Sequence, residues 1–439
     1  MIASPLFLED LMPRRILLIA FVIITMLVLC NTGSFAATSQ AINASADGKA
    51  APDISAPSAI LVEAETGQVL YSKNAGEKLH ISSACKLMTV LVALENSDLN
   101  ANATVSAEAA GMEGSALNLE VGSKYMMNDL LYAIMLTSAN DAATVIAENV
   151  SSGSIVKFVN KMNETSLKLN MSNTHFTNPT GLMDEYQYTT AQDISSLIRY
   201  AIKNTTFNRM FTTKARPWYN PGEEAKILTS SNKLFWGYNG IQGGKTGYNN
   251  KKQQALICTA ARADLNLICI VLDTPEDKLY SDAEALLDYG FNNFWKSTLV
   301  TRGEVLKTAA LDGNEINLVS QSDIKYVHPV GEDYIKEFTA TADLKPPLKK
   351  SIPAGSARYI LEDGTEINVG LYPENEIVPP DDLMTKINKA IQDNKDIFII
   401  VLILVLVEVI LLLFNAGKLV GRLVSWLVKL IRRRNRRST

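Results

Sequence analysis

The chain has 439 residues, of which 47% are hydrophobic and 20% are charged, so it can bury a large core and form two or three domains. Its formal net charge is −4; the eight cations from Lys418 onward are accompanied by no acid, and removing them leaves −12 for the rest. This acidity gives no reason to expect a nucleic acid partner, and the basic tail is better explained by a membrane surface.

The chain begins with the features of a secretory signal peptide. Two arginines precede the apolar run 16–30, and small residues before Ala37 form a cleavage site. We therefore expect residues 1–36 to be a signal peptide, with an uncleaved N-terminal anchor as the alternative. Residues 37–57 are rich in alanine and serine and lack aromatic residues and periodicity, so they are expected to be a disordered linker.

The first motif of chemical interest is Ser83-x-x-Lys86, which follows two short strands predicted on either side of the turn 65–67. Apolar residues after it recur at the spacing of one buried helical face. Ser83 is therefore expected at a helix start, where free backbone N–H groups and the dipole favour negative charge. Positions i and i+3 share a face, so the Lys86 amine can lie beside the Ser83 hydroxyl and, once buried and neutral, act as its base. The alternative is a serine cap beside a solvated lysine.

Two later triplets support the catalytic interpretation of this motif. Ser-Ala-Asn at 138–140 ends an apolar, helix-like run, and Lys-Thr-Gly at 245–247 opens a strand-like run after the glycine-rich segment 237–244. Each triplet alone is a weak signal, but all three motifs, in this order and well separated, are a strong one. Their order matches the set found in class A β-lactamases and penicillin-binding proteins.

On these motifs the chain resembles the D-alanyl-D-alanine carboxypeptidases, low-molecular-weight penicillin-binding proteins that are serine peptidases acting on peptidoglycan stem peptides. The segments SANDAA, HFTNPTGLMDEYQYTTAQD and ALLDYGFNNF are also similar to family segments, closely over 58–294 and more loosely to about residue 380. The resemblance implies an α/β (α+β) catalytic domain of the β-lactamase/transpeptidase type over 58–297, with an antiparallel sheet and helices. Short alternating segments and turn signals predict a small all-β sandwich domain over 298–380, which resembles the pedestal domain of the family.

The resemblance implies a role for each residue of the first two motifs. Ser83 is the acyl-ester nucleophile that attacks the carbonyl between two terminal D-alanines, and Lys86 is the general base that takes its proton. Ser138 relays a proton to the leaving amine, and Asn140 hydrogen-bonds the substrate amide. The acyl-enzyme is then hydrolysed. β-Lactam antibiotics are expected to acylate Ser83 as covalent inhibitors, because they mimic the dipeptide and leave poorly.

By the same resemblance, the third motif is expected to bind the substrate's terminal carboxylate. Lys245 supplies positive charge near the relay serine and the carboxylate, Thr246 hydrogen-bonds the carboxylate, and Gly247 lets the strand backbone approach the substrate closely. The backbone N–H groups of Ser83 and Tyr248 are implied as the oxyanion hole.

Two positions depart from the family pattern. Many relatives have an arginine before the Asn-x-Leu that precedes the third motif, whereas this chain has Ser231. The carboxylate anchor is therefore expected to depend more heavily on Lys245 and Thr246. After the third motif, the small Ala-Gly pair of many relatives is replaced by Lys252-Gln253, which is expected to narrow or recharge the groove for the stem peptide.

A histidine-based mechanism and a metal site are the other chemistries that the residues allow. His175 lies in a family-like loop, His328 lies outside the catalytic region, and nothing marks an acid partner for His80. A Ser-His-Asp triad is therefore the weaker alternative. No cluster has metal-ligand spacing, so no metal or cofactor is expected.

Two of the four cysteines are expected to face each other. The runs ALICTAAR and LNLICIVL are typical of antiparallel strands joined by a two-residue turn at 263–264, which places Cys258 opposite Cys269. The pair is expected to be two buried free thiols, because free cysteine often behaves as a small hydrophobe, with a cross-strand disulfide as the alternative.

The end of the chain departs from the usual family ending. After a linker over 381–396, the run 397–414 is apolar except for Glu408 and is long enough for a transmembrane helix. The basic residues of 415–439 place this tail in the cytoplasm by the positive-inside rule, with the catalytic domain outside the cell membrane and the lipid bilayer as a partner. The tail resembles the amphipathic helix that holds many relatives on the bilayer. Glu408 is expected to be a tolerated polar residue, with a contact site as the alternative.

The sequence therefore predicts a membrane-anchored serine D-Ala-D-Ala carboxypeptidase that removes the terminal D-alanine from peptidoglycan stem pentapeptides. A class A β-lactamase shares the motifs, but it needs a glutamate that activates the deacylating water and normally lacks both the β pedestal and a transmembrane tail. The third hypothesis is a catalytically silent scaffold that keeps the fold and binds wall peptides or a membrane partner.

Overall fold

The computed structural model describes residues 51–220, 224–248, 253–331, 333–377 and 383–435. The predicted signal peptide, most of the predicted linker, Lys252 and the last four residues lie outside the described residues.

The chain divides into two compact units. Of the described residues, the first unit comprises those up to 299 together with 324–336 and 360–366, and the second comprises 300–323, 337–359 and those from 367 onward.

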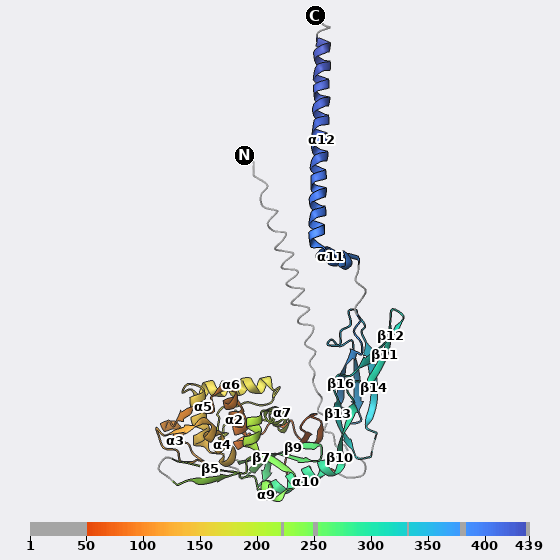
Figure 1. Ribbon diagram of the computed structural model, residues 1–439. Coiled ribbons are helices and arrows are strands. Elements are labelled where there is room, and N and C mark those ends of the chain that lie inside the picture. Colours follow the sequence, from red (N-terminus) through yellow and green to blue (C-terminus); the bar gives the residue numbers. More distant parts are fainter. Residues whose placement is uncertain (1–50, 221–223, 249–252, 332, 378–382, 436–439) are drawn as a thin grey trace, which may run out of the picture. The chain divides into compact units, whose positions relative to one another are not determined.

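A five-stranded antiparallel sheet forms the centre of the first unit (Figure 1). Its strands, in spatial order, are β2 (Val69–Lys73), β1 (Ser58–Glu63), β9 (Leu265–Pro275), β8 (Gln253–Arg262) and β7 (Ile241–Tyr248). The predicted strands around the turn 65–67 are therefore confirmed as β1 and β2. The third motif was predicted to open a strand, but it lies in the second half of β7.

The glycines before the third motif explain this error. A Cβ at Gly243 would lie 2.5 Å from the Phe211 ring, and one at Gly244 would lie 2.4 Å from Asn232 Nδ2. Both glycines therefore permit close packing within a strand, whereas the sequence pattern suggested a loop.

The predicted hairpin of β8 and β9 is confirmed in register. The strands are joined at residues 263–264, and Cys258 lies directly opposite Cys269. Both side chains are fully buried free thiols, as expected.

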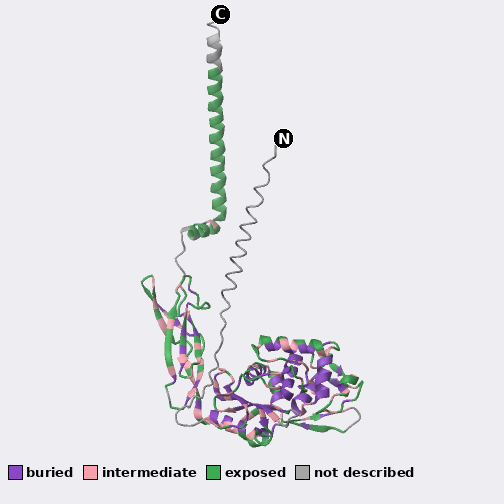
Figure 2. Cartoon of the chain, turned by 180° about the vertical axis from the view of Figure 1, so that it is seen from behind, coloured by how far each residue is buried: buried purple, intermediate pink, exposed green. Residues whose placement is uncertain are grey.

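Helices cover both faces of the sheet, because the pleat sends alternate side chains of each strand to opposite sides. Ile257 belongs to a hydrophobic cluster with the helices around α2 (Cys85–Asn96), and the adjacent Leu256 belongs to a second cluster that includes α10 (Leu279–Asn293). Every residue of α2 from Cys85 to Ala93 is buried, so α2 is surrounded by other elements, as Figure 2 shows in purple. The other helices of this unit are α3 (Ala107–Ala110), α4 (Met127–Thr137), α5 (Asn140–Val150), α6 (Ile155–Lys168), α7 (Ala191–Ala201), α8 (Thr205–Phe211) and α9 (Leu234–Gly237).

Three short strand pairs complete the described part of this unit: β3 (Asn102–Thr104) with β4 (Lys124–Met126), β5 (Ala215–Trp218) with β6 (Lys226–Thr229), and β10 (Phe294–Val300) with β13 (Ile324–Pro329).

Residues 51–57, which composition assigned to a disordered linker, are ordered. Ile54 and Ala56 are buried in the cluster that includes α10, and the Ala56 N–H donates a 2.8 Å hydrogen bond to the carboxylate of Asp282. The short apolar side chains of this segment fit a buried site that composition alone does not reveal.

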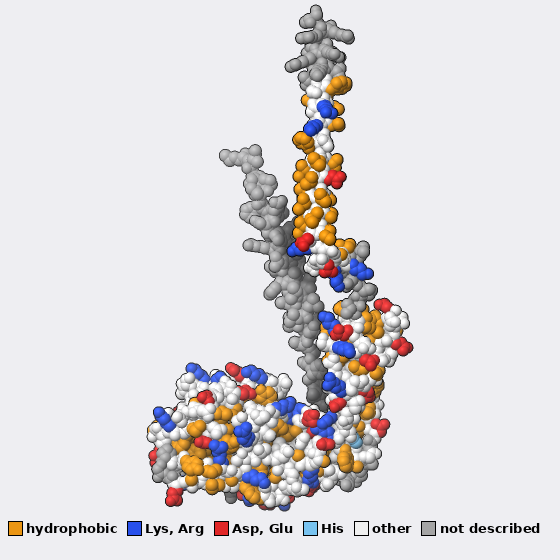
Figure 3. Space-filling view, in the orientation of Figure 1, with side chains coloured by type: hydrophobic (Ala, Val, Ile, Leu, Met, Phe, Trp, Pro, Cys, Tyr) orange, Lys and Arg blue, Asp and Glu red, His pale blue; other side chains and the backbone are white. Residues whose placement is uncertain are grey.

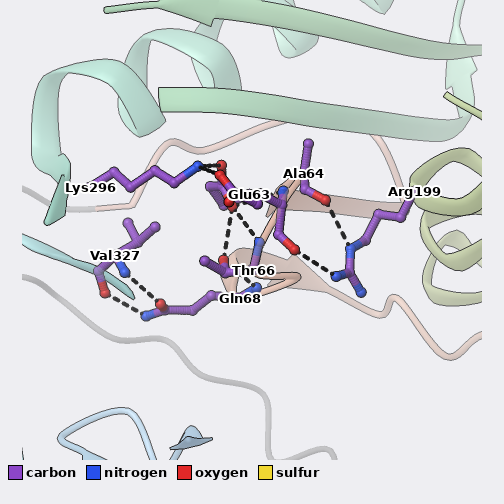
Figure 4. A network of polar contacts seen from close by, with 8 residues as sticks. Glu63, Ala64, Thr66, Gln68, Arg199, Lys296 and Val327 are labelled. Carbon is purple, nitrogen blue, oxygen red and sulfur yellow. Dashed lines mark hydrogen bonds and ion pairs between the residues drawn. The ribbon is translucent and has the colours of Figure 1, made fainter. Parts of the chain in front are cut away.

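A buried ion pair holds the turn between β1 and β2 (Figure 4). Glu63 is fully buried, and its Oε1 accepts a hydrogen bond of 2.8 Å from Lys296 Nζ, whose side chain is 3% exposed. Its Oε2 accepts hydrogen bonds from the backbone N–H groups of Glu65 and Thr66 and from the Thr66 hydroxyl. Lys296 also pairs with the carboxylate of Glu65. Burial lowers the pKa of Lys296, but the hydrogen bonds to the Glu63 and Glu65 carboxylates raise it by more, so the pKa lies above its usual value.

Two further side chains tie this turn to distant segments of the first unit. Gln68 exchanges two hydrogen bonds with the backbone of Val327, one of 2.8 Å and one of 3.0 Å. Arg199 donates to the carbonyls of residues 64–65. Gly67 has φ of +78°, and a Cβ there would lie 2.3 Å from the Arg199 guanidinium, so this turn requires glycine.

The second unit contains the extra β domain that the sequence predicted. Its five-stranded sheet has the order β11 (Val305–Leu311), β12 (Asn314–Val319), β16 (Glu366–Pro373), β15 (Gly355–Leu361) and β14 (Ile335–Ala342).

The chain continues into α11 (Leu383–Asp393) and the long helix α12 (Lys395–Asn435). Hydrophobic side chains surround much of α12, and its described side chains are exposed (Figures 2 and 3). Residues 395–427 are long and apolar enough to cross a membrane. The sequence predicted a span over 397–414 followed by a separate amphipathic helix, but the structure has one continuous helix. Gly417 and Gly421 are only mild helix breakers, and propagation past them is cooperative.

Candidate active site

A cavity of about 260 Å³ is lined by residues from all three sequence motifs. Five of the eight predicted site residues line it: Ser83, Ser138, Thr246, Gly247 and Tyr248. The other three predicted residues, Lys86, Asn140 and Lys245, are buried behind its wall.

Ser83 lies in a single 3₁₀ turn, Ser82–Ala84, that leads directly into α2 at Cys85. The prediction of a helix start is therefore confirmed, with a tighter turn ahead of the α-helix. Ser82 has a positive φ of 50°, an uncommon conformation for a residue with a side chain. A buried, strained turn of this kind fixes the direction of the next side chain, and Ser83 is the half-buried residue that faces the cavity.

Lys86 is 1% exposed and is held by two oxygen acceptors. Its Nζ donates a 2.7 Å hydrogen bond to Asn140 Oδ1 and a short one to the carbonyl of Thr180. Burial lowers the pKa of Lys86 to about 8, and the negative charge of Asp141 only partly opposes this effect. A neutral amine has two hydrogens and one lone pair. The two hydrogens are used by these acceptors, so the lone pair is the part of the amine that can accept a proton.

Among the described residues, the hydrogen bonds of Lys86 do not include one to Ser83 Oγ. The sequence predicted from the three-residue spacing that the Lys86 amine would lie beside the Ser83 hydroxyl. A direct hydrogen bond between them is not part of this structure. Such bonds in apo active sites are often long and tighten only when substrate binds.

The second motif spans a sharp break between two helices. Ser138 follows α4 in the left-handed conformation, with φ of 60°, and Asn140 is the first residue of α5. The Asn140 Nδ2 donates a 2.6 Å hydrogen bond to the carbonyl of Glu113, which fixes its amide so that Oδ1 faces Lys86. The two motif residues therefore point to different places, Ser138 to the cavity and Asn140 to the lysine behind it.

Lys245 is also 1% exposed, and it makes three hydrogen bonds. Its Nζ donates to Ser138 Oγ at 2.6 Å and to the carbonyls of Ile134 and Met135 at 2.9 and 3.2 Å. Burial lowers the pKa of Lys245, and the charge of Lys86 lowers it further. The two amines therefore oppose each other's protonation. The two carbonyls accept from Lys245, and the Ser138 hydroxyl can accept or donate, so these contacts fit Lys245 in either protonation state.

The remaining residues of the third motif lie where β7 passes the nucleophile turn. A Cβ at Gly247 would lie 2.5 Å from Ser82 Oγ and 3.3 Å from the Ala84 nitrogen, so the missing side chain lets β7 approach this turn. The sequence predicted that Gly247 would permit close approach of the substrate; the close neighbour in the structure is the protein itself. The Thr246 hydroxyl contacts the hydroxyl of Ser231.

Several residues near the cavity escaped the sequence prediction. Thr180 acts through its backbone carbonyl, which no side-chain pattern reveals, although it lies in the family-like segment around HFTNPTGL. Lys233, Glu276 and Tyr280 line the cavity from segments without a recognisable motif. Lys233 lies two residues after Ser231, which departs from the family pattern. This departure was the one feature of the sequence that could have drawn attention to Lys233.

The histidines have other neighbours. His80 Nδ1 accepts the N–H of Ser82, His175 Nδ1 contacts the carbonyl of Tyr186, and His328 Nε2 contacts the Ser297 hydroxyl. Within the described part of the chain, none of the three lines the cavity.

Comparison with known proteins gives a consistent result. A profile of the Peptidase S11 family, D-alanyl-D-alanine carboxypeptidase, matches residues 45–276. The chain is 31% identical over 326 residues to D-alanyl-D-alanine carboxypeptidase DacF of Bacillus subtilis, a match that covers 71% of this chain and 83% of the relative. It is 32% identical over 257 residues to a D-alanyl-D-alanine carboxypeptidase of a Streptomyces species, covering 55% of this chain and 88% of that protein.

Solved structures share the fold. Penicillin binding protein 5 from Haemophilus influenzae has a TM-score of 0.64 at 24% identity and covers 75% of this chain and all of its own. The Streptomyces K15 DD-transpeptidase has a TM-score of 0.53 at 30% identity, covering 56% of this chain and 100% of that structure.

Proposed function

Since this chain belongs to the D-alanyl-D-alanine carboxypeptidase family of serine peptidases, we propose that it removes the terminal D-alanine from peptidoglycan stem pentapeptides through an acyl-enzyme on Ser83. The observation that most supports this proposal is the state of Lys86. It is a buried amine with a pKa lowered to about 8, and its Nζ donates to two acceptors, which in the neutral form leaves the lone pair to accept a proton.

In the first step, Ser83 Oγ attacks the carbonyl carbon of the penultimate D-alanine while Lys86 takes the hydroxyl proton. The oxygen of the resulting tetrahedral intermediate is held by the backbone N–H groups of Ser83 and Tyr248. Losing one such donor typically costs ~3 kcal/mol of transition-state stabilisation.

The second step breaks the amide bond and releases D-alanine. The leaving nitrogen takes a proton from Ser138, whose hydroxyl oxygen is fixed by the Lys245 hydrogen bond at 2.6 Å, and the proton held by Lys86 replaces it. Asn140 orients the amine of Lys86, in addition to its proposed contact with the substrate amide. Water then attacks the ester carbonyl and gives a proton to Lys86. As the bond between the acyl carbon and Ser83 Oγ breaks, Lys86 returns this proton to Ser83 Oγ, which frees the serine and the shortened peptide.

The carboxylate of the departing D-alanine is proposed to lie against Thr246, at the end of β7 and on the wall of the cavity. A β-lactam carries a carboxylate in a similar position and acylates Ser83 by the same first step. Its leaving group stays attached and obstructs water, so the product is long-lived.

We further propose that α12 anchors the protein in the cell membrane. Residues 395–427 form a helix long and apolar enough to span a bilayer, and the sequence beyond them is rich in arginine. The positive-inside rule then places the end of the chain in the cytoplasm and the catalytic unit outside. The β domain of residues 298–380 serves in this arrangement as the pedestal suggested by the family resemblance.

The deciding experiment uses a fluorescent penicillin with the wild type and the Ser83→Ala variant. We expect stable labelling of the wild type, no labelling of the variant, and D-alanine release from a pentapeptide by the wild type only. Rapid loss of the label would instead indicate a β-lactamase, and no label at all would indicate a scaffold. Recovery of the labelled protein in the membrane fraction, with the catalytic unit open to external protease, tests the anchor and its orientation.

A further inference from the structure

The substrate's carboxylate needs a positive partner that Lys245 is poorly placed to provide directly. The Nζ of Lys245 forms hydrogen bonds with Ser138 and with two backbone carbonyls, and these three partners occupy all of its polar positions. The side chain is 1% exposed and lies behind the cavity wall. Lys245 can hold Ser138 and contribute to the local field, but a direct contact with a ligand would require it to give up one of these bonds.

The hydroxyls that line the cavity can donate hydrogen bonds but carry no charge. Two of them, those of Thr246 and Ser231, contact each other at the third motif. A carboxylate bound by hydroxyls alone would leave water without a compensating cation, which is costly.

Lys233 is the one cation among the described residues that line the cavity. It is exposed and lies two positions beyond Ser231. Its Nζ is 5.6 Å from the centroid of the Tyr280 ring, within the range of a cation–π contact.

Tyr280 also fixes the backbone that carries this lysine. Its hydroxyl donates a 3.0 Å hydrogen bond to the carbonyl of Ser231 and accepts one of 3.3 Å from the N–H of Lys233. The backbone of 231–233 is therefore held by one tyrosine, and Lys233 lines the same cavity as Thr246.

Glu276 is the acidic residue among the described residues that line the same cavity. Among the described residues it forms no ion pair with Lys233, so the ammonium is not neutralised by this neighbour. A carboxylate ligand is repelled by Glu276 and attracted by Lys233, so a position nearer Lys233 is favoured.

We propose that Lys233 is a specificity-determining residue that binds the terminal carboxylate of the substrate. This inference rests on the proposed carboxypeptidase function. Such a contact is present both in the bound substrate and in the transition state, so its loss raises KM and leaves kcat nearly unchanged.

The test compares full-length wild type, Lys233→Gln and Lys233→Arg on a pentapeptide ending in D-Ala-D-Ala and on the same peptide with a C-terminal amide. We expect Lys233→Gln to raise KM for the carboxylate substrate by roughly 3- to 10-fold, the range expected for one charged hydrogen bond at a partly exposed site. KM for the amide should not change, and Lys233→Arg should retain most of the preference. Lys278→Gln, which removes an exposed lysine that does not line the cavity, is the matched control.

The outcomes separate the two proposals. If the wild type releases D-alanine and Lys233→Gln behaves like Lys278→Gln on both substrates, or loses kcat on both alike, the Lys233 assignment is wrong and the carboxypeptidase function stands. If the wild type releases nothing from either peptide and is not acylated by benzylpenicillin, both proposals are overturned. If it is acylated without peptide hydrolysis, the carboxypeptidase function fails alone. Lys233 is then tested by acylation with benzylpenicillin and its methyl ester, where only the carboxylate form should respond to Lys233→Gln.

Discussion

Lys86 Nζ donates a 2.7 Å hydrogen bond to Asn140 Oδ1, although 54 residues separate the two in the chain. This bond joins the first and second motifs behind the cavity wall, just as the 2.6 Å bond from Lys245 to Ser138 joins the second and third motifs. The three motifs therefore form one chain of contacts, in which each lysine holds a residue of the Ser-Ala-Asn triplet. Their order in the sequence is compatible with this arrangement but does not reveal it.

The first prediction concerns pH. Lys86 must be neutral to take the proton of Ser83, and burial lowers its pKa from 10.5 to about 8. Below about pH 8 the amine is mostly protonated and inactive as a base; above it the amine is mostly neutral. The rate of acylation by a fluorescent penicillin should therefore rise with pH and level off above about pH 8. A rate that stays flat from about pH 6 to pH 9 would contradict the role of Lys86 as base.

The second prediction tests the partner of this amine. Asn140→Asp keeps the shape of the side chain but places a carboxylate at hydrogen-bond distance from Lys86, which favours the protonated amine. The pH profile of acylation should move to higher pH, and the rate at pH 7 should fall about tenfold or more. The matched control is Asn149→Asp, an exposed position on the same helix α5. An unchanged profile in Asn140→Asp would show that Asn140 does not control the protonation of Lys86.

The third prediction separates stability from chemistry. Glu63 is fully buried against Lys296 (Figure 4). Removing its carboxylate leaves Lys296 with only the exposed Glu65 as a partner and leaves the N–H groups of residues 65 and 66 without their acceptor. Glu63→Ala should lower the free energy of unfolding of the first unit by about 3–5 kcal/mol. Acylation of Ser83 in the protein that remains folded should be unaffected. The melting temperature and the labelling rate measure the two effects.

Two further variants complete this test. The double variant Glu63→Ala with Lys296→Met should recover part of the loss, because the lysine that has lost its buried partner is removed as well. Asp343→Ala breaks an exposed ion pair with Lys345 and should have little effect on melting. Equal destabilisation by Asp343→Ala and Glu63→Ala would mean that burial is not the cause.

The sequence predicted much of the fold because its local signals agree with the tertiary structure. The hairpin that places Cys258 opposite Cys269 has strong β-forming residues and a two-residue turn, so its register followed from counting. The sequence did not predict the start of β7. Gly243 and Gly244 suggest a loop, and only the contacts with Phe211 and Asn232 show why glycine is needed in a strand there.

The same limit applies to the candidate site. Residue types and order identified Ser83, Lys86 and Lys245, because the chemistry restricts which side chains can serve. The acceptors that distinguish the two lysines are mostly backbone carbonyls, such as that of Thr180, and a carbonyl is present at every residue. Such partners depend on the path of the chain and leave no mark in the sequence.

The last prediction concerns the contact between β7 and the nucleophile turn. A Cβ at Gly247 would lie 2.5 Å from Ser82 Oγ, a buried hydroxyl without a hydrogen-bond partner among the described residues. Gly247→Ala should push the turn away from β7 and displace Ser83, and a misplacement of ~1 Å can cost ~100-fold in acylation rate. Gly76→Ala, where a Cβ meets nothing within 4 Å, is the matched control. Adding Ser82→Gly removes the clashing hydroxyl and suits the φ of 50°, so the double variant should regain part of the rate. If Ser82→Gly gives no recovery, the clash is with the Ala84 backbone, and if Gly247→Ala itself acylates normally, the close approach of β7 does not position Ser83.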